Sequence, residues 1–304
     1  MDWFFIALGA PFLWAIVNIV DKYLVDKYSD RNHGSGGLVL YSSLIGIFVA
    51  IGIAIFTDNI FSISLMDKIL LLITGVLSIV WIILYLFTLE IEDVSSVAPW
   101  FLTVPIFGYI LGYIFLRETL TTNQIIGSVI VLLGAFLISI DFMGEKKKIK
   151  IKPTLYMLSV SFIVAVVGLI FKYVTIEGNF WVSSFWEYAG LGLAGILIFC
   201  LVPQYRKDFI RMNKSGGKKI FSLNITSEFI SVIGNFLTNF ALLLAPITMV
   251  YLVDSFQPVV LLFLTIIGTK FFPKIISENL HHKILIPKII AILIIIIGSI
   301  LLFV

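Results

Sequence analysis

The chain has 304 residues, of which 60% are hydrophobic and 13% are charged, with a mean hydropathy of +1.10 and a net charge of +3. Because about a quarter of the residues of a soluble domain are charged, this composition excludes a water-soluble globular protein. The positive charges lie mainly in short polar connections, which leave no room for a soluble catalytic or nucleic-acid-binding domain, and the single cysteine, Cys200, cannot form an intrachain disulfide.

Apolar runs of about twenty residues follow one another along the whole chain, and a helix needs about this length to cross ~30 Å of hydrocarbon. A transmembrane barrel would show short alternating segments instead, so the runs predict an all-α integral membrane protein. No basic residue precedes the first run and no small-residue cleavage site follows it, so we interpret it as a retained span. The ten predicted spans cover residues 3–21, 38–57, 69–89, 94–116, 124–142, 154–176, 180–203, 220–244, 246–272 and 284–304.

The distribution of positive charge predicts an orientation. All but three of the 21 Lys and Arg residues lie in connections that follow odd-numbered spans or at the span ends beside them, and the exceptions are Lys68, Arg117 and Lys172. The positive-inside rule places connections rich in Lys and Arg in the cytoplasm. We therefore predict a multi-pass protein with both termini outside, in the plasma (inner) membrane of a prokaryote.

A lysine-rich stretch divides the spans into two groups of five. Shifting the sequence by 150 aligns residues 11–23 with residues 161–173, and shifting it by 153 aligns Pro105 with Pro258. A chance match of apolar runs is the alternative to duplication. Since five is odd, a duplicated second group would cross the membrane in the opposite direction, as in transporters with inverted repeats. The predicted units are a first five-helix repeat over residues 1–143, a connector over residues 144–153 and an inverted second repeat over residues 154–304.

Residues 86–138 combine a proline in mid-span with the ending L-x-E-x-L-T-x-x-Q-x-x-G, which runs from Leu116 to Gly127. On these residues the chain resembles the drug/metabolite transporter superfamily, in particular its EamA-type domain. The resemblance is strongest in the first half, since Phe271 stands where Glu118 would map. It implies a ten-helix carrier with a central cavity between the halves. Bacterial members of this layout usually keep both termini inside, whereas the charge distribution predicts the opposite.

Polar side chains recur at helical spacing inside several predicted spans. An ionised side chain at mid-depth costs roughly 2.5–3.5 kcal/mol on insertion scales, so polar groups are expected to face the protein interior. Bonding to a neighbouring helix is the alternative role of the serines and asparagines, and Asp21 and Glu228 lie near span ends and could simply be solvated. The predicted substrate-binding residues are Trp14, Asn18, Asp21, Trp81, Tyr85, Trp100, Trp186, Glu187, Ser231, Asn235, Asn239, Tyr251 and Asp254.

Glu187 and Asp254 lie in apolar spans without a basic residue at similar depth in their own helix, and a buried carboxyl of this kind binds either a proton or a cation. Aromatic faces attract ammonium groups. Pro105 and Pro258 interrupt helical hydrogen bonding in mid-span and are predicted hinges. These features predict a secondary transporter that moves an organic cation, an amine or an amino-acid-like solute by alternating access, with or without proton coupling.

Two other functions remain open from the sequence. An anionic or lipid-linked sugar or phosphate substrate would require basic residues, and its only support is Lys22 and Lys172. A non-transporting membrane subunit is the other class. No nucleotide-binding or catalytic motif occurs, so we predict no enzyme activity, no cofactor and no metal site. The predicted partners are a small-molecule substrate, membrane lipids and, in coupled transport, protons, with no nucleic acid, and the protein would act as a monomer or homodimer.

Overall fold

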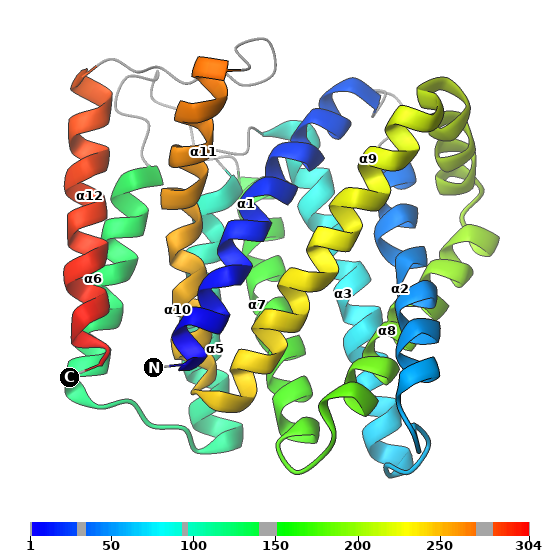
Figure 1. Ribbon diagram of the computed structural model, residues 1–304, viewed down its shortest axis with the longest axis horizontal. Helices are drawn as coiled ribbons and strands as arrows, with labels where there is room; N and C mark the ends of the chain where they lie inside the picture. Colours follow the sequence, from blue (N-terminus) through cyan, green and yellow to red (C-terminus); the bar gives the residue numbers. More distant parts are fainter. Residues whose placement is uncertain (1, 29–34, 93–96, 140–150, 272–281, 304) are drawn as a thin grey trace.

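The structure is a computed structural model that describes residues 2–28, 35–92, 97–139, 151–271 and 282–303. All regular structure within these ranges is helical (Figure 1). The elements are α1 (Asp2–Tyr28), α2 (Gly36–Phe56), α3 (Leu65–Ile91), η1 (Ala98–Thr103), α5 (Val104–Leu111), η2 (Gly112–Leu116), α6 (Thr122–Ser139), α7 (Ile151–Thr175), α8 (Phe180–Leu201), α9 (Pro203–Leu244), α10 (Ile247–Val253), η3 (Asp254–Phe256), α11 (Gln257–Phe271) and α12 (His282–Leu301).

The helices are those of a membrane protein. Among the described residues, seven helical stretches are long and apolar enough to cross a membrane, and shorter apolar helices cover Trp100–Leu116, Thr122–Leu137 and Ile286–Leu301. Large apolar side chains point outward from these helices; Phe48, for example, is 69% exposed and Ile55 is 70% exposed. A surface of this kind suits hydrocarbon rather than water. The chain is therefore an integral, multi-pass membrane protein.

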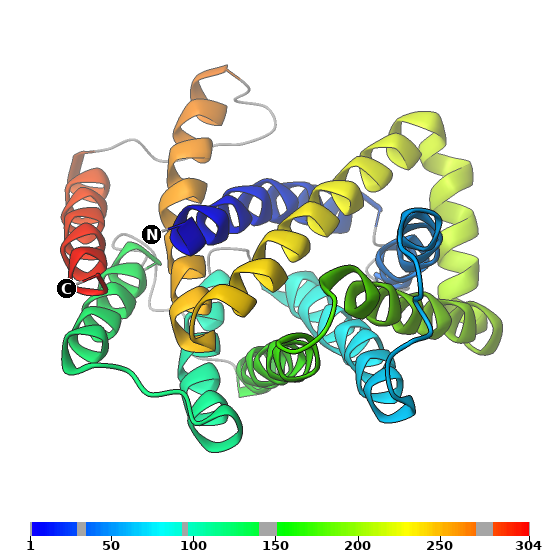
Figure 2. The same cartoon turned by 60° about the horizontal axis from the view of Figure 1, so that its bottom comes forward.

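Successive helices run in alternating directions, and both ends of the chain lie at the same end of the bundle, at the bottom of Figure 1. The turns between α2 and α3 and between α7 and α8 lie at this end too. Helices α1 and α9 cross the middle of the bundle at a slant, whereas α6 and α12 form a pair at its edge in both views (Figure 2). Glycines bring this pair together, since a Cβ at Gly127 would lie 2.8 Å from the carbonyl oxygen of Gly298.

Glycines also bring α3 and α8 into backbone contact. A Cβ at Gly75 would lie 2.2 Å from the carbonyl oxygen of Glu187, and a Cβ at Gly190 would lie 2.3 Å from the carbonyl oxygen of Leu72. Small residues allow helices in a membrane to approach this closely. The contact joins a helix of the first half of the chain to one of the second half and fixes the depth at which Glu187 lies.

Two of the predicted spans are interrupted helices. In the first half, the 3₁₀ segment η1 precedes α5, and Pro105 is the second residue of α5. In the second half, the 3₁₀ segment η3 separates α10 from α11, and Pro258 is the second residue of α11. Proline has no N–H to donate, which makes the start of a helical segment its favoured place. Each proline thus lies next to an interruption of an α-helix by a 3₁₀ segment. Their role as hinges stays a prediction.

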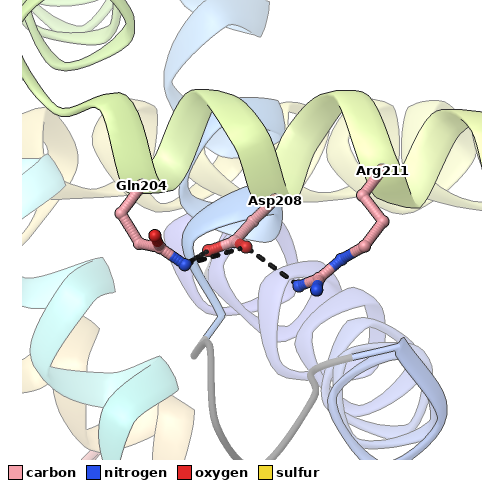
Figure 3. A network of polar contacts seen from close by, with 3 residues as sticks. All are labelled: Gln204, Asp208 and Arg211. Atoms are coloured by element: carbon pink, nitrogen blue, oxygen red, sulfur yellow. Dashed lines mark hydrogen bonds and ion pairs between the residues drawn. The ribbon is translucent and has the colours of Figure 1, made fainter.

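The connection after α8, expected to be a polar loop, is helical instead. The first part of α9 turns sharply from the rest (Figure 2), and the backbone changes direction at Gly217, whose φ of 58° favours glycine. Asp208 accepts hydrogen bonds from Gln204 and pairs with Arg211 at 2.9 Å (Figure 3). Nearby, burial first and then the charges of Glu90 and Asp208 raise the pKa of Tyr205. The apolar face of this segment rests on the start of α2.

Candidate functional site

A cavity of about 180 Å³ lies between the helices of the two halves. It is lined by residues of α1, α2, α3, η1, α5, α7, α8, α9, α10, η3 and α11. Eleven of the thirteen residues that the sequence predicts for a substrate site lie on its wall, namely Trp14, Asn18, Asp21, Trp81, Tyr85, Glu187, Ser231, Asn235, Asn239, Tyr251 and Asp254.

One pair of acids, the Asp21–Glu228 pair, joins α1 to α9. The two carboxyl groups lie close enough to interact electrostatically, and the Ser42 hydroxyl of α2 donates a hydrogen bond to Glu228. Both acids line the cavity. Asp21 and Glu228 are half-buried on this wall, and their role in binding stays a prediction.

A second pair of acids, the Glu187–Asp254 pair, comes from α8 and η3. Glu187 is 3% exposed and accepts a hydrogen bond from the Asn239 side-chain amide at 2.8 Å. Asp254 begins η3, where regular α-helical bonding stops. Both carboxyl groups act electrostatically on the Tyr251 hydroxyl, which donates to the Val164 carbonyl oxygen at 3.0 Å. Glu187 and Asp254 therefore both lie near the Tyr251 hydroxyl.

Aromatic and amide side chains complete the wall. The Tyr85 hydroxyl donates to the Asn18 side-chain oxygen at 3.0 Å, and the ring of Tyr85 lies 6.4 Å from that of Trp81. On the opposite side, the Asn235 amide donates to the Tyr188 hydroxyl at 3.2 Å. Such a wall presents π faces and hydrogen-bonding groups to a solute.

Trp186 and Trp100 were predicted to line the cavity, and the structure places both elsewhere. The Trp186 indole donates to the Ile60 carbonyl oxygen at 2.8 Å and its ring packs against Phe61. Consecutive helical residues point about 100° apart, so a helix that turns Glu187 toward the cavity turns Trp186 away from it. In η1, the neighbouring Phe101 lines the cavity in place of Trp100.

Basic side chains do not line the cavity among the described residues. Lys172 instead forms an ion pair with Glu118 at 2.6 Å and donates to the Ala245 carbonyl oxygen at 2.6 Å. The other Glu118 oxygen accepts from the backbone N–H of Ile247 at 2.8 Å. Lys22 donates to the Leu89 carbonyl oxygen at 3.4 Å. Lys172 and Lys22, which could have supported an anionic substrate, thus contact other parts of the protein and do not line the cavity.

Several lining residues were not among the predicted set. The polar ones are Ser42, Ser78, Tyr188, Glu228, Thr238 and Gln257. Most of them share a helix face with a predicted residue, and helical spacing alone indicates Ser78, Tyr188, Glu228 and Thr238. The apolar ones, including Val17, Val104 and Val164, have no signal of their own, because a valine that faces lipid and a valine that faces a cavity are the same residue.

The comparisons with known proteins point to a transporter family. A model of the EamA-like transporter family matches residues 1–140. Nothing among curated proteins matches. A solved crystal structure of a protein superposes with a TM-score of 0.70 and 11% sequence identity over 99% of this chain and 96% of that chain, which shows a shared fold and nothing further.

Proposed function

The chain belongs to the EamA-like transporter family of the drug/metabolite transporter superfamily, and from this premise we propose that it is a secondary transporter that moves a small organic cation or amine across the membrane by alternating access. The observation that carries the proposal is the chemistry of the cavity wall. Four acids face one space with aromatic rings between them, and no Lys or Arg of the described chain faces it. Carboxylates and π faces both attract ammonium groups.

The proposal includes ten spans arranged as two inverted repeats, over residues 1–143 and 154–304. Seven long helices and three shorter apolar ones support this number. The repeat is supported by the cavity itself, because lining residues recur at fixed sequence offsets. The pairs at an offset of 150 are Trp14/Val164, Val17/Val167, Ser78/Glu228, Trp81/Ser231, Ile82/Val232 and Tyr85/Asn235, and those at 153 are Phe101/Asp254 and Val104/Gln257. Equivalent positions of two inverted repeats would meet in this way around a central site.

We further propose that both termini lie outside, in the plasma membrane of a prokaryote. The termini share one end of the bundle (Figure 1), and the helical segment at the start of α9, with Arg206, Lys207, Arg211 and Lys214, lies at the other. Positive charge favours the cytoplasmic side. The acids of the cavity could exchange a proton for the substrate, which would couple transport to the proton gradient.

The test is uptake of radiolabelled amines into proteoliposomes that contain the purified chain or its Asp254→Asn variant. We expect the variant to lose most uptake, because Asp254 faces the cavity without a hydrogen-bond or ion-pair partner in the described chain. Asp58→Asn, an exposed position in the turn after α2, is the matched control and should transport normally. Full, still pH-dependent uptake by Asp254→Asn would remove this acid from the mechanism. Loss of uptake in Lys22→Gln with normal uptake in Asp254→Asn would favour an anionic substrate.

A further inference from the structure

The four acids of the cavity fall into two pairs with Tyr188 between them. Asp21 and Glu228 interact electrostatically with each other, Glu187 and Asp254 both act on Tyr251, and Glu187 and Glu228 both act on Tyr188. Both pairs line one continuous cavity. A cavity designed around a single positive centre would need only one of them.

The separation of the two pairs can be estimated along helix α9, which contacts both of them. Glu228 lies on α9, and Asn239 of the same helix donates to Glu187 of the second pair at 2.8 Å. Residues 228 and 239 are eleven positions apart, and a helix rises 1.5 Å per residue, so the backbone positions of Glu228 and Asn239 are about 16 Å apart along the helix. Ser231 and Asn235, which also line the cavity, lie on α9 between them.

The space between the pairs has polar groups that lack protein partners. Thr238 is 7% exposed and lines the cavity, and within the described chain its hydroxyl has no hydrogen-bond partner. Asn18, which is 6% exposed, accepts from Tyr85 through its oxygen while its amide nitrogen has no partner in the same ranges. Neither atom is sealed inside the protein; both are open to the cavity, where a solute that extends along it can bond to them.

We propose that the substrate is a linear polyamine, with one terminal ammonium between Asp21 and Glu228, the other between Glu187 and Asp254, and the chain along the aromatic wall between them. This proposal rests on the proposed function and narrows it to a cation with two distant positive centres. Each ammonium placed between two carboxylates relieves the repulsion that those carboxylates would exert on each other.

The length of the substrate follows from the separation of the pairs. If each ammonium lies about 2.8 Å from its carboxylates, the terminal nitrogens are ~10–16 Å apart, which corresponds to an extended chain of about 8–13 single bonds. Spermidine falls within this range, whereas the short diamine putrescine does not reach both pairs. A spermidine that is acetylated on one terminal nitrogen has nearly the same length and one fewer terminal charge.

The experiment is isothermal titration calorimetry of these three amines against the purified full chain in lipid nanodiscs. We expect spermidine to bind at least about tenfold more tightly than putrescine or the acetylated spermidine, a difference of about 1.4 kcal/mol, because only spermidine places a terminal ammonium at both pairs of acids. Glu228→Gln and Glu187→Gln should each remove most of this difference, because each variant leaves one of the two ammonium sites with a single carboxylate. Glu177→Gln, in an exposed turn, is the matched control and should behave as the parent chain.

The outcomes distinguish a failure of the polyamine proposal from a failure of the proposed cation transport. If putrescine and the acetylated spermidine bind as tightly as spermidine, the substrate is a cation with one centre, and the polyamine proposal is overturned while cation transport stands. If none of the amines binds and none enters proteoliposomes, the proposed function itself fails. Should either glutamine variant fail to fold, the comparison of the three amines on the parent chain still decides.

Discussion

The two halves of the chain contribute different chemistry to the cavity from equivalent positions. At the offset of 150, the first half places Trp81 where the second half places Ser231, and Tyr85 where the second half places Asn235. At the offset of 153, Phe101 of the first half corresponds to Asp254 of the second. The first half thus supplies most of the aromatic rings, and the second half supplies three of the four acids.

In the proposed repeat, this difference makes the site asymmetric. The arrangement of the helices requires only that equivalent positions face the cavity. Substitutions at these positions then determine whether a wall is aromatic, polar or acidic. An aromatic wall opposite an acidic wall surrounds an ammonium group on both sides, with π faces on one and carboxylates on the other. Two identical walls would give either a purely apolar pocket or one with unbalanced repulsion.

An ion pair joins the two halves directly. Lys172 of the second half forms a buried ion pair with Glu118 of the first at 2.6 Å. Phe271 stands where an equivalent of Glu118 would map. The Lys172–Glu118 pair therefore ties the two halves together at one end of the bundle.

The largest effect should follow from breaking this contact. Lys172→Met leaves Glu118 without its cation in a buried place, and removal of one partner from a buried pair costs about 3–5 kcal/mol. We expect a large fall in the melting temperature of the purified protein in detergent, measured by thermal unfolding. Lys207→Met, at an exposed position of α9, is the matched control and should lose much less stability. Equal losses in the two variants would contradict a stabilising role of the Lys172–Glu118 pair.

The packing between the halves should give the next largest effect. Gly190→Ala brings a Cβ to within 2.3 Å of the Leu72 carbonyl oxygen of α3, so the two helices must move apart, and overpacking of this kind costs about 1–3 kcal/mol. Gly52→Ala is the control, because nothing lies within 4 Å of its Cβ. Thermal unfolding of both variants checks the prediction. A stable Gly190→Ala protein would show that the halves are not held in backbone contact.

Sequence alone predicted the helical membrane fold and eleven of the residues that line the cavity, because lipid excludes polar side chains. Asn18, Asn235 and Asp254 had to face the interior if the spans were real, and they do. The position of a tryptophan does not predict which way its side chain faces, since tryptophan occurs at membrane interfaces, in helix contacts and in cavities. Trp14 and Trp81 line the cavity, whereas Trp186 packs at a turn.

Features that depend on how helices end could not be predicted in this way. The sequence placed prolines in mid-span but gave no indication that the helical segment after each would start from a 3₁₀ turn. The helical start of α9 was also missed, since its charged residues resemble those of a loop until the kink at Gly217 and the contacts with α2 are known. The number of spans and the inverted repeat stay predictions that the cavity supports.

Exchanging the chemistry of equivalent positions tests the comparison directly. Trp81→Ala removes a π face from the aromatic wall, and a cation–π contact in a desolvated site contributes about 2 kcal/mol, so we expect cation affinity to fall by roughly 10- to 30-fold. Ser231→Ala, at the equivalent place in the other half, should change affinity by less than about threefold. Calorimetry on the two purified variants measures both. A stronger effect of Ser231→Ala would reverse the roles assigned to the two walls.

The smallest effect concerns the two hydrogen bonds between tyrosine and asparagine on opposite walls. Tyr85→Phe removes the donor to the buried Asn18 oxygen at 3.0 Å, and hydrogen bonds between helices in membranes contribute ~0.6 kcal/mol on average and about 1.7 kcal/mol at most. Tyr188→Phe removes a longer bond of 3.2 Å to Asn235, which is less buried, so water in the cavity can replace the lost partner. We therefore expect thermal unfolding to show a small loss of stability for Tyr85→Phe and a smaller one for Tyr188→Phe. The opposite order would mean that the acidic wall of the second half, rather than the aromatic wall of the first, is the more rigid side of the cavity.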